Sequence, residues 1–307
     1  MLTRVTSAGT LWQRQSGNFT LGVNTENNGL FKVEALVTIY SGNSLTVFSN
    51  GAFGRVELYP GATLEGYNGY FGNNGLLTAM PGLNGHFGEG LPFYNDVAGV
   101  VKVDAAIFGI YNATQLPAYS NRMDRGAYWI RNGGQLYLPA NRWINTIGAG
   151  ADVVLDGPGS YFYNLQGLSR VEGVLDLRNR AGFADQPLEG FLYNTGTMRM
   201  ESGCGITTTN SFVQAPSGSL QLEVGASGTP GIQAANWATL DGFVTAFFPG
   251  QNYAAGMEWT FLSLASGHSG GVTGAPTFAY GGTGTPISLV VTWRSGKWAR
   301  YKSTRKA

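Results

Sequence analysis

A short phrase of alternating apolar and polar residues recurs nine times along the chain, each time behind a glycine. The glycines lie 22 to 27 residues apart, with a mean spacing of about 23.6. They open the phrases at Gly29, Gly51, Gly75, Gly99, Gly126, Gly150, Gly173, Gly196 and Gly218. A steady period of about 20 to 50 residues is typical of solenoids, in which each repeat forms one unit and stacks on the next.

Each phrase should form a strand with two side chains directed into a core, because successive side chains of a strand point to opposite faces. When the phrases are aligned from their last residue, one inward column carries no charge at all. It comprises Val33, Val56, Ala79, Val103, Ile130, Leu155, Leu177, Met200 and Leu222. A second apolar column lies two residues earlier. The positions between them, including Lys32, Asp176 and Trp129, should face water, and the same alignment stacks Glu34 beside Glu57.

The period also fits the circumference of a parallel β-helix. About 23 residues at roughly 3.3 Å each give a contour of about 75 Å, enough for three short strands and three turns. Glycine and asparagine accept the positive φ that sharp corners demand. We therefore predict an all-β fold, a parallel β-helix (solenoid) of about nine coils with about 23 residues each, in which neighbouring coils form hydrogen bonds with one another.

Three segments follow from the extent of the repeat. Residues 1–28 have the texture of a partial first coil or N-terminal cap, and residues 29–225 form the parallel β-helix. Residues 226–307 contain longer and more aromatic strand patterns, which suit a β-rich C-terminal cap followed by a basic tail. The longest repeat interval, 99–126, should carry its extra residues as a loop, and such insertions often bear the binding contacts of a solenoid.

Composition narrows the range of partners. Charged residues make up 12% of the chain and hydrophobic residues 43%, which argues against disorder. The net charge of +1 gives no reason to expect a nucleic acid or an anionic membrane as partner.

Cys204 is the single cysteine, so no intrachain disulfide is expected. The chain shows no signal peptide and no run long enough for a membrane span, so we expect a mature exported protein or one that needs no cleaved signal.

The end of the repeat region resembles the end of an autotransporter passenger. The motifs follow one another as Leu220-Gln-Leu-Glu223, Ala238-Thr-Leu-Asp-Gly-Phe-Val244, Pro249-Gly-Gln-Asn-Tyr-Ala-Ala-Gly256, Trp259-Thr-Phe-Leu-Ser-Leu-Ala265 and Ser269-Gly-Gly-Val-Thr-Gly274. The motifs of the resemblance lie within residues 220–274, and the general pattern of repeats is similar over residues 29–293. It implies a right-handed β-helix that ends in a folded cap. Complete autotransporters continue into an outer-membrane barrel, which this sequence does not encode, so the resemblance implies a passenger fragment or a free-standing surface, filament or virion component.

Carboxylate spacing gives no catalytic site. Glycoside cleavage needs two carboxylates that face each other across a groove, whereas Glu34 and Glu57 are expected on one flat column. Asp156, Asp176 and Arg178 imitate an acid and base cluster, but each is also an ordinary member of a surface charge ladder. We therefore predict no catalytic residue.

Metal and cofactor motifs are missing as well. His86 and His268 lie in glycine-rich turns far apart in the sequence, without the spacing of a zinc site. The nonapeptide repeat that binds calcium does not occur, and no glycine-rich loop has the context of a phosphate cradle. We predict no metal and no cofactor.

Aromatic residues are the remaining candidates for a binding surface. Two adjacent coils gather tyrosine and phenylalanine among glycine and asparagine, which suits stacking on sugars, although such rings also fill the wide corners of a core. Further candidates lie in or beside the 99–126 insertion. The predicted binding residues are Tyr67, Tyr70, Phe71, Tyr111, Tyr119, Arg122 and Trp129.

These observations favour a non-enzymatic, extracellular or surface-displayed β-solenoid with a structural or adhesive role. Its partner would be a glycan, a host surface or further copies of itself as an oligomer or filament. Two alternatives stay open, a polysaccharide-active lyase or hydrolase on the same scaffold and a self-assembling filament or virion subunit. An acidic groove with convergent carboxylates would favour the enzyme, and an exposed aromatic patch would favour adhesion.

Overall fold

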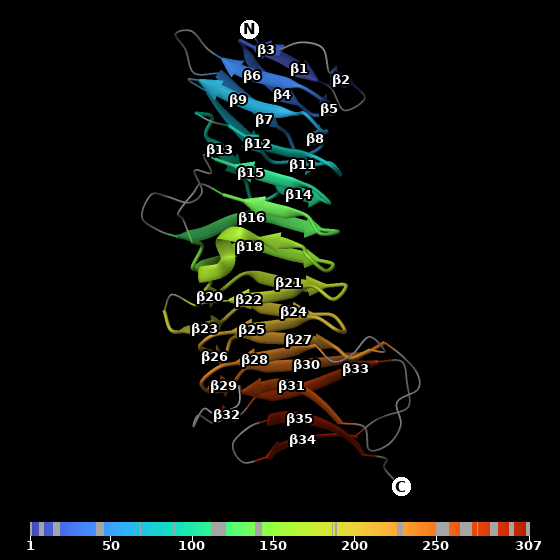
Figure 1. The fold of residues 1–307 in the computed structure, drawn as a ribbon, viewed down its shortest axis with the longest axis vertical. Helices are drawn as coiled ribbons and strands as arrows, with labels where there is room; N and C mark the ends of the chain where they lie inside the picture. The colour runs from blue at the N-terminus through green and yellow to red at the C-terminus, as the bar shows by residue number, and fades with distance from the viewer. Residues whose placement is uncertain are drawn as a thin grey trace. The chain divides into compact units, whose positions relative to one another are not determined.

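The computed structural model is all-β and forms a parallel β-solenoid of about nine turns with about 24 residues per turn, which confirms the predicted fold class. Figure 1 shows the stacked strands. The structure describes residues 2–5, 9–14, 19–40, 46–67, 69–88, 90–111, 121–138, 143–185, 187, 189–225, 230–249, 258–264, 272–274, 276–282, 288–294 and 298–304.

The chain divides into two compact units. Unit 1 comprises residues 1–144 and 150–164, and unit 2 comprises residues 145–149 and 165–307. Strand β18 (Thr146–Asp156) contributes residues to both, and a 3₁₀ turn, η1 (Tyr163–Gly167), follows β19.

Unit 1 is built from coils of three strands, and each strand pairs in parallel with its counterparts in the neighbouring coils. Face A consists of β1 (Leu2–Val5), β4 (Asn24–Asn27), β7 (Thr46–Asn50), β10 (Gly69–Asn73) and β13 (Phe93–Asn95). Face B consists of β2 (Thr10–Gln13), β5 (Leu30–Val33), β8 (Arg55–Leu58), β11 (Leu76–Ala79), β14 (Val100–Asp104) and the second half of β16 (Arg122–Arg131). Face C consists of β3 (Phe19–Leu21), β6 (Leu36–Tyr40), β9 (Thr63–Tyr67), β12 (Asn84–Phe87), β15 (Ile107–Ile110), β17 (Gln135–Tyr137) and β19 (Tyr161–Phe162).

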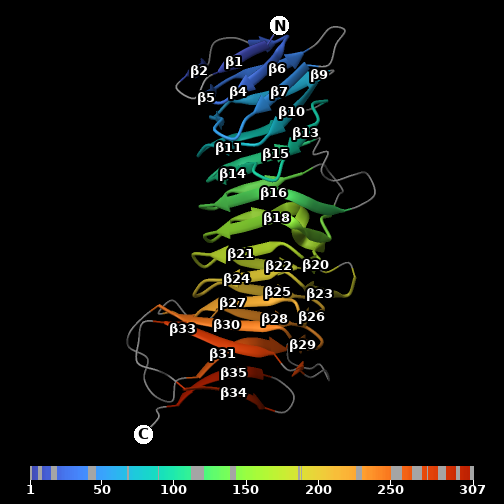
Figure 2. The same cartoon turned by 180° about the vertical axis from the view of Figure 1, so that it is seen from behind.

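Unit 2 repeats the three-strand coil, as Figure 2 shows from behind. Its first face holds β20 (Arg170–Val171), β23 (Phe191–Asn194), β26 (Ser211–Gln214), β29 (Ala238–Leu240) and β32 (Val272–Thr273). Its second face holds β21 (Val174–Arg178), β24 (Thr197–Met200), β27 (Ser219–Glu223), β30 (Phe243–Phe248) and β33 (Thr277–Gly282). Its third face holds β22 (Gly182–Asp185), β25 (Gly205–Thr208), β28 (Gly231–Ala234), β31 (Glu258–Leu264), β34 (Ser288–Arg294) and β35 (Trp298–Thr304).

Parallel pairing continues beyond residue 225, where the sequence suggested a cap. Strand β27 pairs in parallel with β30, and β30 with β33. Among the described strands, antiparallel pairing occurs between β31 and β35 and between β34 and β35. The coil pattern therefore extends to residue 282, and the antiparallel ribbon follows it.

The core of unit 1 is filled by the inward columns and by a stack of phenylalanine rings. Val33, Val103 and Ile130 are fully buried, as the aligned phrases predicted. The rings of Phe48 and Phe71 stack with centroids 4.8 Å apart and planes 9° apart. Because strands lie about 4.8 Å apart, an inward ring in one coil falls directly on the ring of the next.

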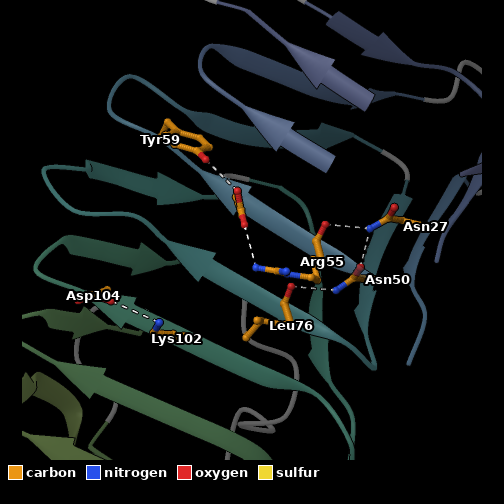
Figure 3. A network of polar contacts seen from close by, with 8 residues as sticks. Asn27, Asn50, Arg55, Tyr59, Leu76, Lys102 and Asp104 are labelled. Atoms are coloured by element: carbon orange, nitrogen blue, oxygen red, sulfur yellow. Dashed lines mark hydrogen bonds and ion pairs between the residues drawn. The ribbon is translucent and has the colours of Figure 1, made fainter. Parts of the chain in front are cut away.

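The predicted alignment of the second phrase was wrong by two residues. Gly54 N donates to Gly51 O at 2.8 Å, so residues 51–54 form a turn and the strand begins only at Arg55. In the observed register Glu57 lies beside Lys32 rather than beside Glu34. Glu57 is nearly buried and accepts hydrogen bonds from Arg55 at 3.2 Å and Tyr59 at 2.8 Å, as Figure 3 shows for the labelled partners.

Asp176 also departs from its predicted exposure. It occupies the polar position of β21, yet its side chain is 5% exposed because Arg178 of the same strand folds over it. The Arg178 Nη2 atom lies 2.6 Å from Asp176 Oδ2, and Nε lies 3.0 Å away. A polar side chain on the outer face of a strand can thus be shielded from water by the residue two positions along the same strand.

The corner between faces A and B of unit 1 contains a buried asparagine ladder. The Nδ2 atom of Asn27 donates to Asn50 Oδ1 at 2.8 Å, Asn50 to Asn73 at 2.7 Å, and Asn73 to Asn95 at 2.7 Å. Each Nδ2 also donates to a backbone carbonyl of the next coil, those of Arg55, Leu76, Val100 and Ala127. Figure 3 shows the bond from Asn27 to Asn50 and the bonds from these two side chains to the Arg55 and Leu76 carbonyls. The ladder satisfies polar groups that would otherwise be costly to bury.

Candidate functional site

A groove with a volume of about 480 Å³ opens on the face-A side of unit 1. It crosses β7, β10 and β13 and reaches the beginning of β16. The lining residues are Ser49, Tyr70, Gly72, Asn73, Asn74, Tyr94, Asn95, Asp96, Asp124 and Arg125. We call this hollow the face-A groove.

Two tyrosines form an aromatic wall of the face-A groove. The rings of Tyr70 and Tyr94 meet edge to face, with centroids 5.5 Å apart and planes at 78°. Tyr94 is 45% exposed. The two rings therefore offer apolar surface at a right angle, and each retains a hydroxyl for polar contacts.

The face-A groove also has a charged lining. The Arg125 Nη1 atom lies 3.6 Å from Asp96 Oδ1, and Arg122 Nε donates to Asp124 Oδ1. Asp96 Oδ1 also accepts a hydrogen bond from Val97 N at 2.8 Å. Both aspartates of the lining are thus paired with arginines, and about half of each carboxylate side chain remains exposed.

The predicted binding residues do not form one site. Tyr70 lines the face-A groove, and Arg122 positions Asp124 at its edge. Trp129 is 42% exposed on face B, where it lies beside Lys102 in register. Tyr111 is exposed at the end of β15, with its ring 5.0 Å from that of His86.

Phe71 is a correction to the predicted set. Its side chain is fully buried, and it packs between Phe48 and Phe93 in the core stack, so no surface ligand reaches it. It follows Tyr70 in β10, and the alternation of the strand sends the two rings to opposite faces. Tyr67 ends β9, but its side chain lies outside the described residues, as does the whole of Tyr119.

The sequence did not single out Gly72, Asp96, Asp124 or Arg125. These residues are brought together by stacking across coils. An alignment of the face-A strands would have revealed them, because Ser49, Gly72 and Tyr94 lie beside one another in successive strands.

A second, smaller hollow of about 210 Å³ lies on the second face of unit 2. It is lined by Asp176, Arg178, Arg199, Met200, Glu201, Gln221, Glu223 and Phe247. Burial raises the pKa of the Glu223 carboxyl above its usual value, and the negative charge of Glu201 adds to the effect. A carboxyl group whose pKa is raised by burial is a feature that general acid catalysis uses.

Among the described residues, the remaining reactive groups give no further site. Burial raises the pKa of the Cys204 thiol, which makes it a poor nucleophile at neutral pH. Within the residues that the structure describes, no group of three or more histidine, cysteine or acidic side chains is arranged to hold a metal ion. The described part of the chain contains no helical segment with the length and apolarity that crossing a bilayer requires.

Comparison with known proteins adds no assignment to this geometry. The sequence matches no protein-family model and no curated protein, so the autotransporter resemblance has no independent support. The structure establishes the parallel β-solenoid fold, and this fold is the part of the expectation that it supports.

Proposed function

We propose that this chain is a non-enzymatic β-solenoid that binds a glycan in the face-A groove. The observation that carries the proposal is the groove itself, in which the Tyr70 and Tyr94 rings face a lining of aspartate, arginine and asparagine. A sugar ring has an apolar face of C–H groups and an edge of hydroxyls. An aromatic wall beside polar side chains matches both parts.

The pairing of the groove carboxylates supports binding rather than cleavage. A glycosidase needs one carboxyl group that donates a proton and a second that acts as base or nucleophile across the same bond. Asp96 and Asp124 are instead each held by an arginine. Such pairs suit hydrogen bonding to hydroxyl groups, since the carboxylates accept and the guanidinium groups donate.

We place the protein outside the cell, on a cell or virion surface. The resemblance of residues 220–274 to the end of an autotransporter passenger supports this location, and so does a long, sparsely charged strand repeat. A structural or adhesive role follows, in which the solenoid is the scaffold and the groove makes contact. Assembly of several copies would raise the strength of attachment by multivalency.

A glycan array probed with the labelled chain tests this function. We expect binding to at least one class of polysaccharide, and loss of that binding when Tyr70 and Tyr94 are both changed to alanine. Trp237→Ala is a matched control, because Trp237 is an exposed aromatic residue of unit 2 and should leave binding intact. Binding that survives the double substitution would refute the face-A groove as the site.

A second candidate function is polysaccharide cleavage at the hollow of unit 2, and the two carboxyl groups of its lining, Glu201 and Glu223, favour it. Glu223, with its raised pKa, would donate the proton. Incubation with polysaccharides, followed by an assay for new reducing ends, tests this idea. Activity that Glu223→Gln abolishes would establish the enzyme, and no release of sugar from any substrate would reject it.

A further inference from the structure

Gly72 lies on the floor of the face-A groove at a position where the fold does not require glycine. Its φ lies outside the left-handed region. A Cβ atom added there would have Tyr70 Cε2 at 3.9 Å and Phe48 O at 4.0 Å as its nearest neighbours, which is ordinary van der Waals contact. The backbone would therefore accept a side chain without strain.

The corner glycines of the same unit behave differently. At Gly54, Gly75 and Gly99 an added Cβ would overlap backbone oxygen atoms of the neighbouring coil. Those glycines are needed for the close approach of one coil to the next. Gly72 has no such role, so its missing side chain affects the surface rather than the fold.

The missing side chain is what opens the face-A groove. Ser49, Gly72 and Tyr94 occupy the same outward column in three successive strands. Strands lie about 4.8 Å apart, so the backbones of β7 and β13 lie about 10 Å apart, and Gly72 between them leaves a gap in the column of side chains. Tyr70, two residues before Gly72 on the same strand, closes the gap on one side.

We propose that Gly72 is the specificity-determining position of a subsite for one neutral pyranose ring, an inference that rests on the proposed glycan binding. The ring lies over the Gly72 backbone with its C–H face against Tyr94 and its edge toward Tyr70. Its hydroxyls reach Asp96 and Arg125. The sugar is neutral because the charges of the lining are already matched, Asp96 with Arg125 and Asp124 with Arg122.

Isothermal titration with defined oligosaccharides tests the subsite. The probes are cellohexaose, maltohexaose and chitohexaose with N-acetyl groups as neutral ligands, and oligogalacturonate and a heparin oligosaccharide as anionic ones. We expect a neutral probe to bind, and Gly72→Leu to weaken its binding at least tenfold by filling the gap. Gly182→Leu is the control, because Gly182 is also a strand glycine and has open space around its Cβ position.

The outcomes separate this inference from the proposed function. Neutral binding that Gly72→Leu leaves unchanged would overturn the role of Gly72 while glycan binding stands. Binding of anionic probes alone would overturn the neutral ligand. If array and titration both show no glycan binding, the proposed function fails and this inference fails with it. Should Gly72→Leu melt well below the parent protein, Gly72→Ala replaces it, with an expected weakening of about threefold.

Discussion

The same corner of the coil carries a succession of asparagines in unit 1 and a polar pair flanked by apolar residues in unit 2. In unit 1 the last residue of each face-A strand from β4 to β13 is an asparagine of the ladder. In the matching column of unit 2, Asn194 and Gln214 lie between Val171 and Leu240. Asn194 donates to Gln214 at 3.2 Å, and Gln214 donates to Phe243 O at 2.8 Å.

The glycine that follows this column is common to both units. Gly75 in unit 1 and Gly218 in unit 2 both lie against backbone oxygens that an added Cβ would strike. The tight approach of coils at this corner thus depends on glycine, whereas the asparagine ladder is an additional device. It fixes neighbouring coils in one register, because a slip by one residue would leave every buried amide without its partner.

Breaking the longer ladder should have the largest effect. Asn50→Leu removes the acceptor for Asn27 Nδ2, the donor to Asn73 Oδ1 and the donor to Leu76 O. Because unsatisfied buried polar groups cost about 1 to 3 kcal/mol each, we expect unit 1 to lose about 3 kcal/mol or more. Urea denaturation and amide hydrogen exchange around Leu76 would measure this loss.

Asn194→Leu serves as the counterpart in unit 2. Its ladder has a single side-chain rung, so we expect a loss of only about 1 to 2 kcal/mol. Equal losses for the two substitutions would show that ladder length does not matter, which would remove the proposed difference between the corners.

Extending the short ladder should sharpen the comparison. Asn194 Oδ1 is buried and has no hydrogen-bond donor in the described structure, and Val171 precedes Asn194 in the column. Val171→Asn places an amide where it can donate to that oxygen. A double-mutant cycle with Asn194→Leu should give a favourable coupling of about 1 kcal/mol, and a coupling near zero would mean that the new amide does not join the ladder.

The smallest expected effect is a pH dependence confined to unit 2. The Glu223 pKa is raised in the folded state, so folding favours the protonated carboxyl. The contribution of this group to stability is then greatest below its unfolded pKa, about 4.5, and declines as pH rises through the folded value. Glu223→Gln should flatten the stability of unit 2 across that range, measured by thermal melts between about pH 4 and pH 7. A profile as steep as that of the parent would assign the effect to another group.

The periodic glycines and the uncharged columns were enough to predict the solenoid and much of its core. Positions such as Val103 and Leu177 are buried because the alternation along the strand and the alignment between coils both direct their side chains into the core. The second phrase was misaligned because Gly51 and Gly54 are both plausible strand starts, and only the hydrogen bond of the turn decides between them.

Contacts between side chains of neighbouring strands were the hardest part of the structure to predict. Asn27, Asn50, Asn73 and Asn95 recur at the repeat period, so the ladder could have been found by aligning face A as well as face B. The face-A groove combines residues of four strands, and its opening depends on the side chain that Gly72 lacks. Asp176 is covered by the conformation of Arg178, which the alternation of a strand does not reveal.

The asparagine ladder has translational symmetry, since each internal member gives and receives the same bond. Unit 1 could therefore be lengthened or shortened by whole coils. Removal of residues 28–50 would join Asn27 to Gly51 and present Asn27 to Asn73 in the place of Asn50. Insertion of one coil at this corner adds a rung and deletion of one coil removes a rung, and in both cases the remaining asparagines keep their partners.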